Sequence, residues 1–418
     1  MKILLVNKYF YIKGGSETYF FGLKKMLEDH NHEVIDFSME DEKNFHSDYQ
    51  EYFVANKEYE NVGKVQKIKN ALSLIHSNEA YKKLCKLIEN TRPDIAHVNL
   101  IYHQLTPSIF HALKKYNIPV VFTSHDYKVI CPNYKLYSKD EICNKCQGGA
   151  FYHCAINKCH KDSSLYSTLL SIESYFHKYK KSYQIADYII CPSNFMLEQL
   201  ASAGYKREKL VHFPNFLTND FLNREAVGIK DNRTLLYYGR LSREKGLDLL
   251  LDANKLVQAD YILKIIGTGP EEERLKKRVE DENIKNVIFL GFKTGDDLQR
   301  EIREAKATII PSTWHEVFGL TIIESYSVGT PVIGSNLGGV PENIIDKKTG
   351  YIFEANNADN LKDCIEEIVN MDKESEEYKQ MEEACLSFKN KFSTEKYYKD
   401  LIELYKNLIS NKGMDGVS

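Results

Sequence analysis

The chain has 418 residues, more than a single hydrophobic core usually supports, so we expect two domains of about 200 residues each. Hydrophobic residues make up 43% of the sequence and charged residues 28%, which excludes a disordered or fibrous protein. A net charge of -3 argues against a dedicated nucleic-acid-binding protein, and no apolar run approaches the length of about 18 residues that a membrane helix needs.

In the first half of the chain, short apolar runs alternate with amphipathic stretches. A helix is expected at residues 16–30, directly after Gly14-Gly15, and the pattern pauses near Pro214. Such alternation is typical of a parallel sheet that is covered by helices on both faces. Strands are expected at residues 2–6, 33–37, 94–98, 119–123 and 188–191.

After Pro214 the same alternation restarts, and a final helix is expected at residues 395–408. The prediction is therefore an α/β fold with two doubly wound, Rossmann-like domains that face each other across a cleft. Strands are expected at residues 235–238, 262–266, 287–290, 308–310 and 332–333. The predicted parts are a domain at 1–214 with a cysteine-rich insertion at about 128–163, a domain at 215–392, and a C-terminal helix and tail at 393–418 that pack back on the first domain.

Two acids follow the strand expected at residues 308–310. Glu316 lies in the loop, a helix is expected to begin near Phe318 or Gly319, and Glu324 lies two turns further on. The free N–H groups at the start of a helix attract anions, so a carboxylate beside them suggests a neutral, hydroxyl-rich group at that place. Glu316 as a simple helix-capping acid, with Glu324 at the surface, is the alternative.

A second loop with candidate functional residues follows the strand expected at residues 235–238. Arg240 and Lys245 bring two positive charges to the carboxyl end of that strand, between Gly239 and Gly246. A planar guanidinium and a mobile ammonium together suit a diphosphate. A solvated basic turn explains the same residues equally simply.

The first domain carries weaker signals. Gly14-Gly15 at a helix start suits a phosphate-approach turn, but the third glycine of the dinucleotide-binding fingerprint is missing, so NAD binding is poorly supported. His125 lies just after the strand expected at residues 119–123, and a lone histidine at a strand end is commonly a hydrogen-bonded structural residue.

Taken together, Glu316-x7-Glu324 with Arg240 and the pair Lys245-Gly246 resembles the retaining glycosyltransferases of family 4, which have the two-Rossmann-domain GT-B architecture. The resemblance extends over essentially the whole chain. Supporting matches are Gly14-Gly15, Ser124-His125-Asp126, Pro214-Asn215 and Gly338-Gly339-Val340-Pro341-Glu342.

The resemblance implies a role for each matching residue. Arg240 and Lys245 would grip the diphosphate of a nucleotide-activated sugar, and Glu324 would bond the ribose hydroxyls. Glu316 would contact the donor sugar, with His125 near the reaction centre. The catalytic set is then Glu316, His125, Arg240 and Lys245, and further donor contacts come from Gly15 and from the amides of Phe318, Gly319 and Leu320.

The implied function is that of a retaining, metal-independent glycosyltransferase of the hexosyltransferase type (EC 2.4). It would move a sugar from a nucleotide diphosphate sugar to a saccharide or lipid-linked saccharide, in assembly of capsule, exopolysaccharide or lipopolysaccharide. We expect a cytoplasmic protein that can rest peripherally on the anionic cytoplasmic face of the inner membrane and that does not bind nucleic acid. A sugar-nucleotide epimerase or a phosphorylase on the same fold is the alternative enzyme.

Five of the nine cysteines lie close together in the sequence. Two close pairs, Cys143-x2-Cys146 and Cys154-x4-Cys159, have the spacing of a structural zinc knuckle. Reduced, packed thiols and redox or disulfide chemistry are the alternatives. The segment resembles an insertion of some surface-polysaccharide members of the family. A zinc-knuckle nucleic-acid-binding protein is the rival reading from a different functional class.

Overall fold

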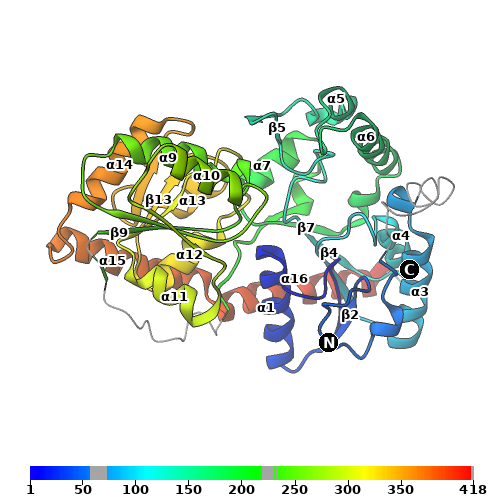
Figure 1. The fold of residues 1–418 in the computed structure, drawn as a ribbon. Helices are drawn as coiled ribbons and strands as arrows, with labels where there is room; N and C mark the ends of the chain where they lie inside the picture. Colours follow the sequence, from blue (N-terminus) through cyan, green and yellow to red (C-terminus); the bar gives the residue numbers. More distant parts are fainter. Residues whose placement is uncertain (57–72, 219–229, 232, 416–418) are drawn as a thin grey trace. The chain divides into compact units, whose positions relative to one another are not determined.

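The computed structural model describes residues 1–56, 73–218, 230–231 and 233–415 (Figure 1). The chain forms two compact units. Unit 1 comprises residues 1–136, 143–214 and 394–418, and unit 2 comprises residues 137–142 and 215–393. The short hairpin β5–β6 (Tyr137–Ser138 and Glu141–Ile142) is thus grouped with the second unit.

Unit 1 is built on a six-stranded parallel sheet in the order β2-β1-β3-β4-β7-β8. Most of the strand residues are buried on both faces, which is why these strands read as continuous apolar runs in the sequence. The strands are β1 (Lys2–Val6), β2 (Glu33–Phe37), β3 (Ile95–Val98), β4 (Val120–Thr123), β7 (Tyr188–Cys191) and β8 (Leu210–His212).

The helices of unit 1 include α16 (Thr394–Asp415), the last helix of the chain. Its Tyr397 hydroxyl lies 2.5 Å from the Tyr19 hydroxyl on α1, and its Tyr405 hydroxyl bonds His97 on β3. These buried polar contacts tie the C-terminal helix into the first unit. The other helices are α1 (Gly15–Asp29), η1 (Gln50–Tyr52), α3 (Asn78–Thr91), α4 (Ser108–Lys115), η2 (Gln147–Gly149), α5 (Tyr152–Asn157), α6 (Ser164–Tyr179), η3 (Ser182–Ile185), α7 (Asn194–Ser202) and η4 (Arg207–Lys209).

Unit 2 has a second six-stranded parallel sheet, in the order β11-β10-β9-β12-β13-β14. From β9 the chain adds β10 and β11 on one side of the sheet, and then β12, β13 and β14 on the other side. The direction in which strands are added therefore reverses between β9 and β12. The strands are β9 (Thr234–Tyr238), β10 (Ile262–Ile266), β11 (Val287–Gly291), β12 (Ala307–Ile310), β13 (Val332–Ser335) and β14 (Gly350–Phe353).

Helices cover both faces of this sheet: α9, α10 and α14 gather on one side, and α11, α12 and α15 on the other (Figure 1). The layers are held by separate apolar clusters, one of which includes Leu250 of α9 and Ile365 of α14. The helices are η5 (Arg243–Lys245), α9 (Leu247–Leu256), α10 (Glu272–Asp281), α11 (Gly295–Glu304), α12 (Leu320–Ser327), α13 (Val340–Asn343), α14 (Ala358–Asn370), α15 (Glu376–Phe388) and η6 (Lys389–Phe392).

The prediction of two doubly wound α/β domains is confirmed. All ten expected strands are present: four have the expected ends, and the ends of the other six differ by one or two residues. Two edge strands, β8 and β14, were not expected, and α12 begins at Leu320 rather than at Phe318 or Gly319. In β8 only one of three residues is buried, so the strand leaves a weak apolar signal in the sequence.

Candidate active site

The loops that follow β9 and β12 meet at the point where the strand order of unit 2 reverses. Such a switch point opens a crevice beyond the carboxyl ends of the strands, where ligands of this fold class bind. The two loops approach closely, because the Thr313 amide donates to the Glu244 carbonyl at 3.0 Å. Gly246 has a φ of +71°, and a Cβ there would lie 1.8 Å from the Pro311 carbonyl oxygen. Only glycine fits at this contact.

Lys245 and Glu316, one from each loop, form an ion pair. The Lys245 ammonium donates to Glu316 Oε1 at 2.7 Å, and their side chains are 26% and 9% exposed. Ser312 Oγ donates to the same oxygen at 2.5 Å. Burial alone would raise the pKa of Glu316, but the Lys245 charge and these hydrogen bonds hold it below its ordinary value. The carboxylate is therefore ionised at neutral pH.

Arg240 lies on the same loop as Lys245 and is exposed. Its backbone is held in place, because the buried Tyr237 hydroxyl donates to the Arg240 carbonyl at 2.8 Å. Within the described part of the chain, no carboxylate pairs with the Arg240 guanidinium. Its charge is thus available to an external anion.

Two helices begin at these loops, α9 after Gly246 and α12 after Gly319, and neither has a side-chain cap. Two hydrogen bonds hold the loop before α12 in place. The Gly339 amide donates to the Glu316 carbonyl at 2.7 Å, and the Asn343 side-chain amide donates to the Phe318 carbonyl at 2.9 Å. Uncapped N-terminal N–H groups attract anions. The amides of Phe318, Gly319 and Leu320, predicted as donor contacts, lie at the start of α12.

Glu324 lies in the middle of α12 and is partly buried. Burial raises its pKa to about 7, and the nearby Tyr238 hydroxyl opposes this only in part. Glu316 and Glu324 thus share one loop and helix but differ in charge state at neutral pH, because only Glu316 has a lysine beside it.

The predicted residues of unit 1 lie at the carboxyl ends of its own central strands. His125 follows β4, and its Nε2 donates to Asn99 Oδ1 at 2.9 Å, while its ring meets the Tyr19 ring edge-on at 4.8 Å. Burial lowers the pKa of His125 to about 3, so the imidazole is neutral. Gly15 is the first residue of α1, whose N-terminus has no side-chain cap.

Asp126, the neighbour of His125, was not singled out from the sequence. It accepts hydrogen bonds from the Tyr102 hydroxyl and from the Lys128 amide. Burial raises its pKa to about 6, against the effect of these hydrogen bonds. A buried acid that titrates near neutral pH is a candidate functional group. Its position directly after His125 was the available signal.

The cysteine-rich segment brings some of its thiols together. Cys146 and Cys154 pack with Phe151, Cys159 lies against this cluster, and Cys143 is close enough to Cys146 to act on its pKa. Burial raises the pKa of Cys146 to about 12. Among the described residues, no group of three or more histidine, cysteine or acidic side chains is arranged to hold a metal ion. Packed thiols fit this arrangement, and the zinc site stays a prediction.

None of the described helices is both long enough and apolar enough to cross a membrane.

Comparison with known proteins assigns the chain to a family. The profile described as "Glycosyltransferase Family 4" matches residues 13–220, and that described as "Glycosyl transferases group 1" matches residues 219–385. An uncharacterized glycosyltransferase of Methanocaldococcus jannaschii, MJ1178, is 26% identical over 98% of this chain and 99% of its own length. The O-antigen chain mannosyltransferase C of Escherichia coli is 27% identical over 45% of this chain and 50% of its own length.

Solved structures show the same fold. Anabaena Alr3699/HepE, crystallised with UDP-glucose, matches 97% of this chain and 100% of its own with a TM-score of 0.68 at 15% identity. The two profiles together extend from residue 13 to residue 385 and cover every strand of both sheets except β1, together with the loops described above. This chain therefore belongs to the family 4 glycosyltransferases.

Proposed function

We propose that this glycosyltransferase moves a hexose from a nucleotide diphosphate sugar, with retention of configuration, to a saccharide or lipid-linked saccharide acceptor. The pathway we propose is assembly of a capsule, an exopolysaccharide or a lipopolysaccharide. The observation that carries the proposal is the Lys245–Glu316 pair at the switch point of unit 2, beside an exposed Arg240 and two uncapped helix N-termini. The UDP-glucose held by the Anabaena protein and the name of the mannosyltransferase support it.

Donor binding exchanges the partner of the Lys245 ammonium, from Glu316 to the diphosphate. In the unliganded protein the Lys245 ammonium is bonded to Glu316. A diphosphate that arrives between Arg240 and Lys245 draws the ammonium towards itself, which leaves Glu316 Oε1 free to accept hydrogen bonds from sugar hydroxyls. One binding event therefore assembles both the phosphate contacts and the sugar contacts.

The same charges act on the chemical step. Cleavage of the sugar–phosphate bond leaves negative charge on the departing diphosphate and positive charge on the anomeric carbon. Fixed cations and helix N-termini stabilise this transition state more than the ground state. Arg240, Lys245 and the starts of α9 and α12 supply positive charge without a divalent metal. We propose front-face attack, in which a leaving phosphate oxygen accepts the proton of the acceptor hydroxyl.

His125, Glu324 and Gly15 complete the proposed donor site. His125 is neutral, so it acts as a hydrogen-bonding group near the sugar and not as a cation. Glu324, with a pKa of about 7, bonds the ribose hydroxyls as an acceptor when ionised and as a donor when protonated. Gly15 allows the distal phosphate to approach the start of α1.

The test begins with donor binding. Trp314 is the only tryptophan of the chain and its ring centroid lies 5.3 Å from the Lys245 ammonium, so its fluorescence reports on the site. UDP-, GDP-, ADP- and dTDP-sugars are titrated, and at least one is expected to change the fluorescence with saturation. Absence of any response across this panel would remove the donor assignment.

Turnover then separates the alternatives. A labelled form of the donor that binds is incubated with and without saccharide acceptors, and the anomeric configuration of the product is read by NMR. Transfer that requires an acceptor and keeps the configuration supports the proposal. Conversion of the donor without an acceptor indicates an epimerase, and a sugar 1-phosphate formed with inorganic phosphate indicates a phosphorylase.

We propose a cytoplasmic location with peripheral contact to the anionic inner leaflet. Lysines at residues 82, 83 and 86 of α3 lie within the described chain, and Lys83 pairs with Glu40 and Glu79. Lysines at residues 57, 64, 67 and 69 lie outside the described residues. Each basic group near such a leaflet contributes about 1 kcal/mol. Cosedimentation with vesicles that contain or lack anionic lipid tests this; equal binding to both would contradict it.

A further inference from the structure

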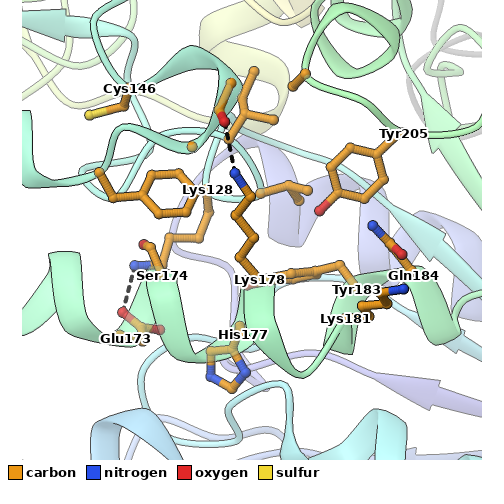
Figure 2. Close-up of a pocket in the computed structure, with 16 residues that line it drawn as sticks. Lys128, Cys146, Glu173, Ser174, His177, Lys178, Lys181, Tyr183, Gln184 and Tyr205 are labelled. Carbon is orange, nitrogen blue, oxygen red and sulfur yellow. Dashed lines mark hydrogen bonds and ion pairs between the residues drawn. The ribbon is translucent and has the colours of Figure 1, made fainter.

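Unit 1 contains a pocket that none of the predicted catalytic or donor-binding residues line, although Cys146 of the predicted zinc set does. It lies between the cysteine-rich segment and the C-terminal half of α6 (Figure 2). Its walls combine aromatic and aliphatic surfaces with charged groups. The residues that matter for the argument are Lys128, Phe151, Glu173, Lys178, Tyr183 and Tyr205.

The buried end of the pocket has unsatisfied hydrogen-bonding atoms. Glu173 Oε2 accepts from the Lys128 ammonium at 2.7 Å, and both side chains are only 2% exposed. Glu173 Oε1 and the Tyr183 hydroxyl have no hydrogen-bond partner in the described part of the chain. A buried polar group without a partner costs about 1–3 kcal/mol, so a partner from outside is expected. A sugar hydroxyl can donate to the carboxylate and accept from the phenol.

The mouth of the pocket is positive. Lys128 is neutralised by Glu173, whereas Lys178 donates to the Gly148 carbonyl at 2.7 Å (Figure 2) and Lys181 is exposed. No carboxylate of the described residues pairs with Lys178 or Lys181. Two unpaired ammonium groups at one opening favour an anion.

His177 also lines the pocket but is not available to a ligand. Its Nδ1 lies 3.0 Å from Ser182 Oγ and its Nε2 lies 2.8 Å from the Ile75 carbonyl, so both ring nitrogens are occupied. Between the polar end and the charged mouth, Phe151, Tyr183 and Tyr205 offer aromatic surfaces of the kind that pack against sugar rings.

We propose that this pocket binds a saccharide unit that carries an anionic group, either a carboxylate or a phosphate. Its hydroxyls reach Glu173 and Tyr183, and its anionic group lies between Lys178 and Lys181. This deepens the proposed function, on which it rests, by assigning the acceptor to the acidic saccharides. Binding to the pocket is measurable without a donor or turnover, so the two proposals fail separately.

The test measures binding of three small probes to the full chain by saturation-transfer NMR: D-glucuronate, glucose 6-phosphate and glucose. We expect at least one acidic probe to bind about tenfold more tightly than glucose, with the tighter of the two identifying the anionic group. Equal binding of all three probes, or binding of none, would overturn the proposal.

Variants locate the binding. Lys178→Met with Lys181→Met is expected to weaken binding of the acidic probe at least fivefold, and Tyr183→Phe to weaken all probes. Lys180→Met is the matched control, because Lys180 is exposed on the same segment but does not line the pocket. Circular dichroism checks the fold of each variant. Unchanged affinity in the double lysine variant, or an equal loss in the control, would show that the probe binds elsewhere.

Discussion

The Lys245–Glu316 pair should stabilise the second unit as well as bind the donor. At 2.7 Å the direct attraction is about 6 kcal/mol for an effective dielectric constant of about 20, and desolvation of both groups offsets most of it. Breaking a fully buried pair costs about 3–5 kcal/mol and an exposed pair about 0–1 kcal/mol. Because Lys245 is 26% exposed, we expect Lys245→Met to lower the free energy of unfolding by about 2–4 kcal/mol.

Removing the Glu316 charge as well should recover part of that stability. In Lys245→Met the Glu316 carboxylate remains 9% exposed without its cation, whereas the double variant with Glu316→Gln buries no unpaired charge. We therefore expect the double variant to be more stable than Lys245→Met alone, with a coupling energy of about 2 kcal/mol or more in the double-mutant cycle.

Urea unfolding followed by Trp314 fluorescence is the assay, since this single tryptophan lies in the second unit next to the pair. Lys255→Met is the control: its ammonium pairs with Glu282 at 2.8 Å, but the two side chains are 42% and 35% exposed. We expect the control to change stability by less than about 1 kcal/mol. If Lys245→Met lowers the free energy of unfolding no more than the control does, or if the cycle shows no coupling, the ion pair does not stabilise the second unit.

Four further predictions follow from the same structure. Arg240→Ala should lower turnover of labelled donor by a factor of about 100–1000 without unfolding the protein, and near-normal transfer would count against the diphosphate assignment. Glu324 has a folded pKa of about 7 against an ordinary value of 4.5, so its own contribution to stability is largest at low pH and is lost as pH rises through this interval. Glu324→Gln should remove this contribution from the pH dependence of the unfolding free energy, and an unchanged slope between these pH values would contradict the raised pKa. Gly246→Ala should lower the melting temperature, because the new Cβ would lie 1.8 Å from the Pro311 carbonyl oxygen; a variant as stable as the parent would show that the loop can move aside. Elemental analysis of protein purified without chelators should find one zinc per chain if Cys143, Cys146, Cys154 and Cys159 are ligands, and its absence would favour packed thiols.

The sequence alone determined the fold class and pointed to the loops that carry the candidate site residues. Strands buried on both faces of a parallel sheet leave continuous apolar runs, so strands such as β1, β2, β7 and β10 could be placed residue for residue. Loops at the carboxyl ends of such strands carry the chemistry, which is why Arg240 and Glu316 stood out.

Only the tertiary structure decided which of these residues meet. Lys245 and Glu316 are 71 positions apart, and their contact depends on β9 and β12 being neighbours in the sheet. The charge states of Glu316 and Glu324 could not be predicted from spacing either, because they depend on burial and on which cation lies nearby.

The pocket of unit 1 shows the same limit. Glu173 and Tyr183 have no recognisable motif in the sequence, and their unsatisfied atoms became visible only once α6, the cysteine-rich segment and the loop after β4 were packed together. A sequence records where strands and helices form because those preferences are local. Partners, burial and cavities arise from contacts between distant segments, so they are settled only when the chain is folded.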